Sequence, residues 1–182
     1  DLEREDLAAV ERGMVNLRRH LHNIRDVWGI PCVVAVNRFP SDTDLEVAKV
    51  VELVESAGAS ACPATHVVDG GTGAQDLAKG VLQALDDPSP YSFGFTYPDD
   101  LALVDKVEAV ASRVYGAGSL SWDAKARKQL ERIEQDGYHA LPVCIAKTQY
   151  SFSTDPKQLG APTGHELRVR EVRLAAGAGF VV

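Results

Sequence analysis

The chain has 182 residues, of which 45% are hydrophobic and 25% are charged, which fits one domain, or one domain with a small addition, around a buried core. Its formal net charge of −7 argues against a nucleic-acid partner, because phosphate binding requires clustered Lys and Arg. No apolar run reaches the roughly 18 residues that span a bilayer and no signal peptide is recognisable, so we expect no membrane partner.

The N-terminal part begins with a predicted helix and a predicted buried strand. Apolar residues recur at spacings of three and four from Leu7 to Ile24, which predicts a long helix that ends near Gly29. Residues 32–36 are all apolar and three of them are Val, which predicts a strand covered on both faces, as in a parallel sheet.

A second helix is expected to follow this strand. Asp42 or Thr43 can cap its N-terminus, and it should end at Gly58. Its inward face is expected to consist of four apolar residues at helical spacing: Leu45, Ala48, Val51 and Val54.

Another strand and helix continue the alternation. Residues 59–68 predict a strand that Pro63 interrupts or shifts, residues 69–73 predict a Gly-rich turn, and apolar residues between Leu77 and Leu85 predict a third helix. Strand–helix alternation at this pitch predicts a parallel, doubly wound unit with right-handed crossovers.

The C-terminal half has a different pattern. Residues 86–98 carry three Pro and four aromatic residues, which predicts a packed connector. Beyond it the sequence predicts two helices, at 100–115 and 122–135, and a second buried strand at 142–146. A Gly- and Pro-rich loop at 151–164 and a last strand at 165–174 are expected to follow.

These elements predict the α/β fold class, with a doubly wound, mostly parallel sheet, flanking helices and a smaller α+β portion at the C-terminus. We expect an α/β unit with the candidate binding turns at 1–90, and a helical connector with a β-containing portion at 91–182.

The cysteines and histidines suggest the compartment and argue against a metal site. Cys32, Cys62 and Cys144 lie beside Pro and apolar residues and form no C-x-x-C pair. We expect buried, reduced thiols and a cytoplasmic location, because a reducing compartment keeps such thiols free. The five His residues show no metal-binding spacing, so no metal ligand is predicted.

Polar side chains follow the strand at 32–36, at the end where open α/β sheets bind ligands. Asn37 could present its amide to the edge of an adenine base, with Asp42 and Thr43 in the same nucleotide-binding turn. Alternatively, the Asn37 amide caps the turn by bonding to the backbone two residues on. The residues alone leave both interpretations open.

Three segments resemble the formate–tetrahydrofolate ligase family. They are VAVNRFPSDT at 34–43, PVCIAKTQYSFS at 142–153 and VREVRLAAGAGF at 169–180, in the order expected for that family. The resemblance spans nearly all of the chain. It implies an enzyme that uses ATP to join formate to N10 of tetrahydrofolate, through formyl phosphate.

The resemblance also assigns a folate site. The matching Phe-Pro pair of the family lies in the folate pocket, which implies that role for Phe39 and Pro40, although the residues alone favour a Phe39 that fills the core. Relatives carry Trp at the position of Val67, as the other wall of the pterin site. Val67 cannot stack with comparable area, and losing an aromatic pair costs about 0.5–1.5 kcal/mol beyond burial. Val67 is therefore a folate-site position at which this chain departs from its family.

Two further groups are candidates for substrate or phosphate contacts. Gly70 and Gly71 follow the strand predicted at 59–68, although such glycines also serve tight turns. Lys147, Gln149 and Tyr150 follow the strand predicted at 142–146, where Lys147 could hold a phosphate or a carboxylate. The alternative for this second group is a polar loop that supports the neighbouring strand.

The sequence contains no phosphate-binding loop. Phosphoryl transfer from ATP with bound magnesium requires a phosphate cradle and a lysine. No G-x-x-x-x-G-K-[ST] sequence occurs here, whereas family members carry one in an earlier region. We therefore expect part of a ligase, with no catalytic residue of its own and no activity by itself, from a protein that forms a homotetramer. The alternative is a non-catalytic binding or interaction module derived from the family.

Overall fold

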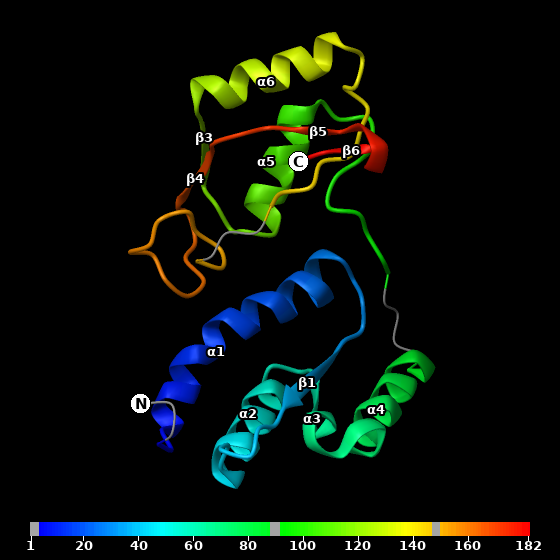
Figure 1. The fold of residues 1–182 in the computed structure, drawn as a ribbon, viewed down its shortest axis with the longest axis vertical. Coiled ribbons are helices and arrows are strands. Elements are labelled where there is room, and N and C mark those ends of the chain that lie inside the picture. The colour runs from blue at the N-terminus through cyan, green and yellow to red at the C-terminus, as the bar shows by residue number, and fades with distance from the viewer. Residues whose placement is uncertain (1–3, 88–91, 147–149) are drawn as a thin grey trace. The chain divides into compact units, whose positions relative to one another are not determined.

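The chain divides into two units, Asp1–Phe93 and Gly94–Val182, in a computed structural model that describes residues 4–87, 92–146 and 150–182 (Figure 1). Each unit combines helices with one pair of parallel strands. The chain is therefore mixed α/β, as predicted.

The first unit alternates helices and strands in the predicted order. Its elements are α1 (Leu7–His22), the π-helical turn η1 (Asn23–Val27), β1 (Val33–Asn37), α2 (Asp44–Ser56), β2 (Ser60–Ala64), α3 (His66–Asp69), the 3-10 turn η2 (Gly70–Ala74) and α4 (Gln75–Asp86). The strand predicted over 59–68 is wrong beyond Ala64, where α3 begins almost at once. The Thr65 N–H donates to the Gly73 carbonyl at 3.0 Å, which turns the chain back before a longer strand can form.

Local signals set the helix ends of this unit. The Asp6 side chain caps α1 by accepting from the Ala9 N–H, and Thr43 caps α2 by accepting from the Glu46 N–H at 3.2 Å. Of the two caps predicted for α2, Thr43 is therefore correct. Gly29 adopts a φ of +62° after η1, as the predicted end of the long helix requires.

The core of the first unit lies between α1, α2 and one face of the β1–β2 sheet. Its buried residues are Met14, Leu21, Val54 and Ala59, with Cys32, Val34 and Ala61 of the strand region packed against them. Figure 1 shows α1 running beside α2.

The predicted inward face of α2 is partly wrong. Val54 is fully buried, but Leu45 and Ala48 are exposed. The buried stripe instead passes through Val47 and Val50, since these positions share the Val54 side of the helix.

Burial of the strand residues is also lower than predicted. Ala35 in the middle of β1 is exposed and the three Val residues of the strand are only partly buried, because the described sheet has two strands and one well-covered face. Cys32 and Cys62 are free and partly buried, whereas Cys144 is free and exposed, so the prediction of buried thiols is wrong for Cys144.

The second unit contains the elements α5 (Leu103–Arg113), β3 (Ser119–Trp122), α6 (Ala124–Gln135), β4 (Glu166–Val169), β5 (Leu174–Ala175), η3 (Ala176–Ala178) and β6 (Phe180–Val181). β3 pairs with β4 in parallel, and β5 pairs with β6 in antiparallel. Both predicted helices are present, and their apolar sides enclose a core with Leu103, Leu130 and Val181.

Three predictions for this half are wrong. The predicted helix start at Trp122 is instead the end of β3. The segment 142–146 forms a single bridge, Val143 to Val181, in place of a strand. The strand predicted over 165–174 ends at Val169, and residues 170–173 separate β4 from β5. The packed connector is correct only in part, because Tyr97 is partly buried and hydrogen-bonded to Val143, whereas Phe93 and Phe95 are exposed.

A buried lysine ties α5 to the segment before that bridge. The Lys106 side chain is fully buried, and its Nζ donates to the carbonyls of Ala140 and Leu141 at 3.2 and 3.1 Å. It also lies 5.9 Å from the centre of the Tyr97 ring, whose hydroxyl bonds to the backbone of Val143. The ammonium group therefore fixes the backbone of Ala140 and Leu141, and the Tyr97 hydroxyl fixes that of Val143, without a carboxylate in these contacts.

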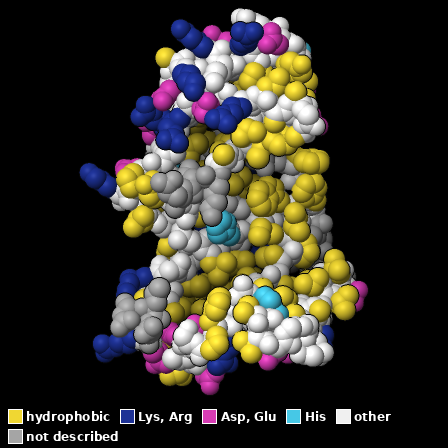
Figure 2. All heavy atoms as spheres, viewed as in Figure 1, with side chains coloured by type: hydrophobic (Ala, Val, Ile, Leu, Met, Phe, Trp, Pro, Cys, Tyr) yellow, Lys and Arg dark blue, Asp and Glu magenta, His cyan; other side chains and the backbone are white. Residues whose placement is uncertain are grey.

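Charged side chains gather on the surface of the second unit, where Lys and Arg alternate with Asp and Glu (Figure 2). Glu171 accepts from Lys125 at 2.9 Å and from Arg173 at 3.0 Å, and these bonds lower the pKa of its carboxyl to about 2. Arg168 pairs with Asp123 at 2.7 Å. These contacts join α6 and its N-cap residue to β4 and to the segment after β4.

In the part of the chain that the structure describes, no helix combines the length and the apolar character that a bilayer crossing demands.

Replacing Lys106 tests the buried ammonium. Lys106→Met keeps most of the stem but leaves two carbonyls without their donor, so we expect the free energy of unfolding to fall by about 2 kcal/mol. Urea titration of the 182-residue chain measures this. Lys128→Met, on the exposed side of α6, is the matched control and should change it by less than about 0.5 kcal/mol. Equal effects would contradict a structural role for Lys106.

The Glu171 cluster predicts a pH dependence of stability. Because folding lowers the pKa of Glu171 from 4.5 to about 2, the ionised carboxylate stabilises the fold above pH 4.5, and this contribution is lost as the pH falls towards 2. Glu171→Gln should flatten the fall in unfolding free energy over that range, as measured by urea titration at several pH values. Glu131→Gln on α6 is the control, and an identical flattening by it would contradict the assignment.

Candidate ligand-binding site

The parallel pairing of β1 and β2 places two turns at one edge of the sheet. Asn37, the last residue of β1, lies opposite Ala64, the last residue of β2. The turns at 38–43 and 65–74 therefore leave the sheet at the same edge. This edge carries the candidates that sequence analysis placed in the first unit.

Backbone hydrogen bonds define the first turn. The Arg38 N–H donates to the Ala64 carbonyl at 3.0 Å and extends the pairing by one residue. The Phe39 N–H then donates to Asp42 Oδ2 at 2.8 Å, and the Asp42 N–H donates back to the Phe39 carbonyl at 3.0 Å. Asp42 closes the turn with its carboxylate, and Thr43 caps α2. Both side chains that were predicted to bind nucleotide thus have backbone partners.

The same turn leaves two other side chains open. Asn37 is exposed, and its amide has no hydrogen bond to the described residues. The Phe39 N–H, which a turn-forming Asn37 would accept from, is bonded to Asp42 instead. Phe39 is 52% exposed and Pro40 is exposed, so the alternative in which Phe39 fills the core is wrong for this unit.

Arg38 is a residue of this turn that sequence analysis missed. Its guanidinium pairs with Asp44 in the first turn of α2, with Nη2 and Oδ1 2.5 Å apart. Its position between Asn37 and Phe39 was the only signal for it. The pair holds the end of β1 to the start of α2.

The second turn is built on glycine. A Cβ at Gly73 would lie 2.6 Å from the Thr65 carbonyl carbon, so this position accepts no larger residue without movement. Gly70 adopts a φ of +58°, whereas Gly71 has no such requirement, and a Cβ at either would meet no atom within 4 Å. Val67 is 61% exposed on the short helix α3 before them. Sequence analysis missed Gly73, although the run of glycines pointed to the segment.

The remaining candidates belong to the second unit. Tyr150 is partly buried and forms a backbone bridge with Ser153. Lys147 and Gln149 lie outside the described residues.

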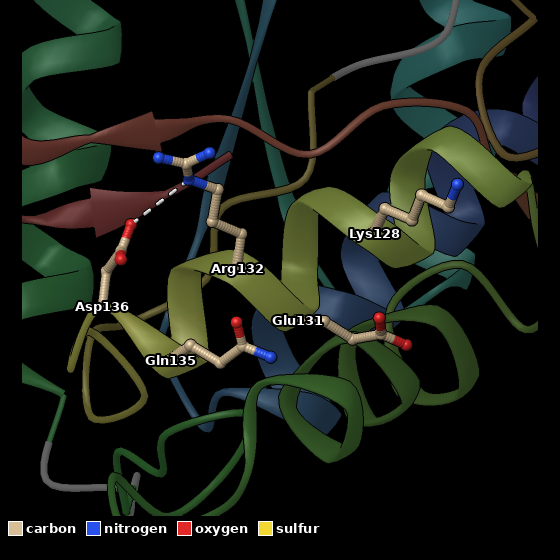
Figure 3. Close-up of a pocket in the computed structure, with 5 residues that line it drawn as sticks. All are labelled: Lys128, Glu131, Arg132, Gln135 and Asp136. Atoms are coloured by element: carbon tan, nitrogen blue, oxygen red, sulfur yellow. Dashed lines mark ion pairs between the residues drawn. The ribbon is translucent and has the colours of Figure 1, made fainter.

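Elsewhere, a shallow hollow lies along α6 of the second unit (Figure 3). It is lined by Lys128, Glu131, Arg132, Gln135 and Asp136. The first four side chains come from α6 and Asp136 is the residue at its C-terminal cap. Arg132 pairs with Asp136 at 3.6 Å, so the hollow is a charged helix surface without enclosing walls.

The described residues contain no group of three or more His, Cys, Asp or Glu side chains that could hold a metal ion.

Comparison with known proteins identifies relatives over the whole chain. Residues 1–182 match the family model described as formate–tetrahydrofolate ligase. The chain is 74% identical over all 182 residues to a formate–tetrahydrofolate ligase of Nocardioides sp., of which it covers 33%. It is 52% identical over 182 residues to the ligase of Symbiobacterium thermophilum and 53% identical over 178 residues to that of Maricaulis maris, and covers 32% of each. It thus spans about a third of the length of these relatives.

The two neighbouring glycines allow a matched test of the second turn. Gly70→Ala forces a side chain into a backbone conformation with φ +58° and ψ −142°, so we expect it to lower the unfolding free energy by about 1–3 kcal/mol. Gly71→Ala has space and no such strain, and should change it by less than about 0.5 kcal/mol. Chemical denaturation of the two variants compares them, and equal losses would contradict the described turn.

Proposed function

This chain belongs to the formate–tetrahydrofolate ligase family, and we propose that it is part of an enzyme that uses ATP to join formate to tetrahydrofolate. The product is 10-formyltetrahydrofolate, formed through formyl phosphate. The observation that carries this proposal is the edge of the first unit, where the family-matching segment leaves the side chains of Asn37, Phe39 and Pro40 open to a ligand.

We assign folate binding to Phe39 and Pro40. An exposed aromatic ring held by a closed turn is suited to stack on a flat heterocycle such as a pterin. Val67 is exposed on the turn that leaves the same edge, and it would supply the opposite wall with less contact area than an aromatic residue. We therefore expect this wall to contribute less to folate affinity here than in relatives with Trp.

We assign nucleotide recognition to Asn37. Its free amide carries one acceptor and two donors, the combination that pairs with the N6 and N7 edge of adenine. Asp42 and Thr43, which we predicted as nucleotide ligands, would serve the site indirectly, because their side chains hold the turn and the start of α2. Gly70, Gly71, Lys147, Gln149 and Tyr150 stay proposed substrate or phosphate contacts.

We assign the phosphate and magnesium chemistry to sequence outside these 182 residues. The chain has no phosphate-binding loop sequence, and its described residues offer no cluster of acidic side chains for magnesium. No catalytic residue is assigned within it, and we propose that it is inactive by itself.

The finer architecture is also proposed. We infer that the β1–β2 pair belongs to a doubly wound sheet in the complete enzyme, and that the ligand turns belong to residues 1–90. We further propose a cytoplasmic homo-oligomer.

A chimera tests this function. These 182 residues would replace the matched segment of the Nocardioides ligase, with which they share 74% identity, and formyltetrahydrofolate production would be assayed with ATP and formate. We expect an active chimera. Phe39→Ala should raise its KM for tetrahydrofolate about tenfold, since about 1.4 kcal/mol of stacking is lost. Asn37→Ala should raise the KM for ATP by a similar factor, because it removes a base contact.

Phe95→Ala is the control, because Phe95 is an exposed aromatic residue of the same type that lies in the second unit. It should leave both constants within about twofold. An active chimera in which Phe39→Ala and Asn37→Ala change neither constant would contradict the residue roles. A folded but inactive chimera would favour the non-catalytic module.

A further inference from the structure

The hydrogen-bond pattern between β1 and β2 shows which backbone groups of each strand face away from the pair. The N–H and C=O of one residue point to the same side of a strand, and successive residues alternate. Arg38 donates to the Ala64 carbonyl, and Asn37 lies opposite Ala64. The backbone N–H and C=O groups of the even-numbered residues of each strand therefore point toward the other strand. The backbone groups of the odd-numbered residues point away from the pair, toward its outer edges.

This alternation makes the two outer edges unequal. On β2 the outward-facing residues are Ala61 and Pro63, and Pro63 has no N–H to offer a further strand. On β1 the outward-facing residues are Val33, Ala35 and Asn37, and none of their N–H groups donates to a backbone carbonyl of the described residues. Pro63 thus leaves the pairing with β1 intact and blocks only the far side of β2.

The covering of the sheet is unequal in the same sense. On the face that α4 covers, Ala64 of β2 is only 1% exposed, whereas Ala35 and Asn37 of β1 are exposed. Gly80 of α4 approaches both strands, but a Cβ there would lie closer to the Cys62 sulfur atom of β2, at 2.9 Å, than to a methyl carbon of Val33 of β1, at 3.4 Å. The helix therefore protects β2 better than β1.

α4 itself has an apolar side without cover in the described structure. Val81, Leu82 and Leu85 are 44%, 60% and 71% exposed. A helix with this many exposed apolar residues beside an open strand is typical of a surface that packs against another part of the protein.

We propose that the free edge of β1 pairs with a strand from the polypeptide that the family carries beyond these 182 residues. In this arrangement β2 is the edge strand of the sheet, because Pro63 blocks pairing on its far side. The chain covers only 33% of its Nocardioides relative, so the other two thirds of that polypeptide are available to supply the strand that pairs with β1. The Val-rich composition of β1, with apolar residues on both faces, fits an internal strand. This proposal concerns the assembly of the sheet and does not depend on the ligase activity.

Amide hydrogen exchange, measured residue by residue, tests the proposal on the 182-residue chain and on the chimera with the Nocardioides ligase. The outward amides of Val33, Ala35 and Asn37 should exchange rapidly in the chain and become slower by on the order of 100-fold in the chimera. The Val34 and Val36 amides, which face β2, are the internal control for a folded sheet. The Ala61 amide, on the far side of β2, should stay rapid in both proteins.

Three results would overturn the proposal. The outward amides of β1 could stay rapid in the chimera, or the Ala61 amide could slow together with them. If protection of the β1 amides in the 182-residue chain increased with protein concentration, the edge of β1 would instead pair with a second copy of the chain. If the Val34 and Val36 amides exchanged rapidly in the 182-residue chain, its sheet would not be folded. The exchange rates of the Ala35 and Ala61 amides in the chimera would then test the proposal, with slow exchange expected only for Ala35.

A proline pair gives an independent measurement in the chimera. Ala35→Pro removes a donor from the edge proposed to be paired, and should lower the melting temperature strongly. Ala61→Pro removes one from the edge proposed to be free and should lower it less. Equal decreases would contradict the difference between the edges.

Discussion

The register between β1 and β2 is the constraint on which the candidate site depends. With Asn37 opposite Ala64, two turns that are about thirty residues apart in sequence leave the sheet at one edge. A shift of the β1–β2 pairing by one residue would move the Asn37 side chain to the other face of the sheet. Asn37 would then no longer lie opposite Ala64, the strand end that precedes Val67. The register is fixed on the other side of the sheet, where Val34 and Ala61 pack against the core formed with α1 and α2. Core packing on one face thus positions the candidate ligand-binding side chains at the end of the strands.

The hydrogen bonds of the first turn explain why its side chains fall into two classes. A turn at a strand end has backbone donors to satisfy, and Asp42 and Thr43 accept from two of them. Because these side chains serve the backbone, the Asn37 amide and the Phe39 ring are left open. In the ligand-binding interpretation that we propose, the capping residues and the contact residues are therefore different residues of one short segment.

Sequence patterns predicted the elements that local signals specify and failed where distant pairing decides. The apolar spacing and the caps gave α1, α2 and α4 because helix signals lie within a few residues. The strand β3 has only four residues and depends on β4, more than forty residues away, so nothing near Trp122 indicated it. The extent of β2 was overestimated because a single bond from Thr65 to Gly73 ends it. Of the site, the segment could be predicted from the family-matching residues, but the division of roles within it required the hydrogen bonds.

The exposed apolar residues of α4 connect folding to function. Full burial of a Val or Leu side chain contributes about 1.5–3 kcal/mol, so covering the remaining exposed half of Val81, Leu82 and Leu85 would add roughly 3 kcal/mol. A whole domain is stable by only about 5–15 kcal/mol. A partner surface on α4 and β1 would therefore supply a substantial fraction of the stability of the first unit. It would also add a wall beside Asn37, since the free edge of β1 ends at that residue. The pairing that stabilises the sheet would then complete the ligand site in the same step.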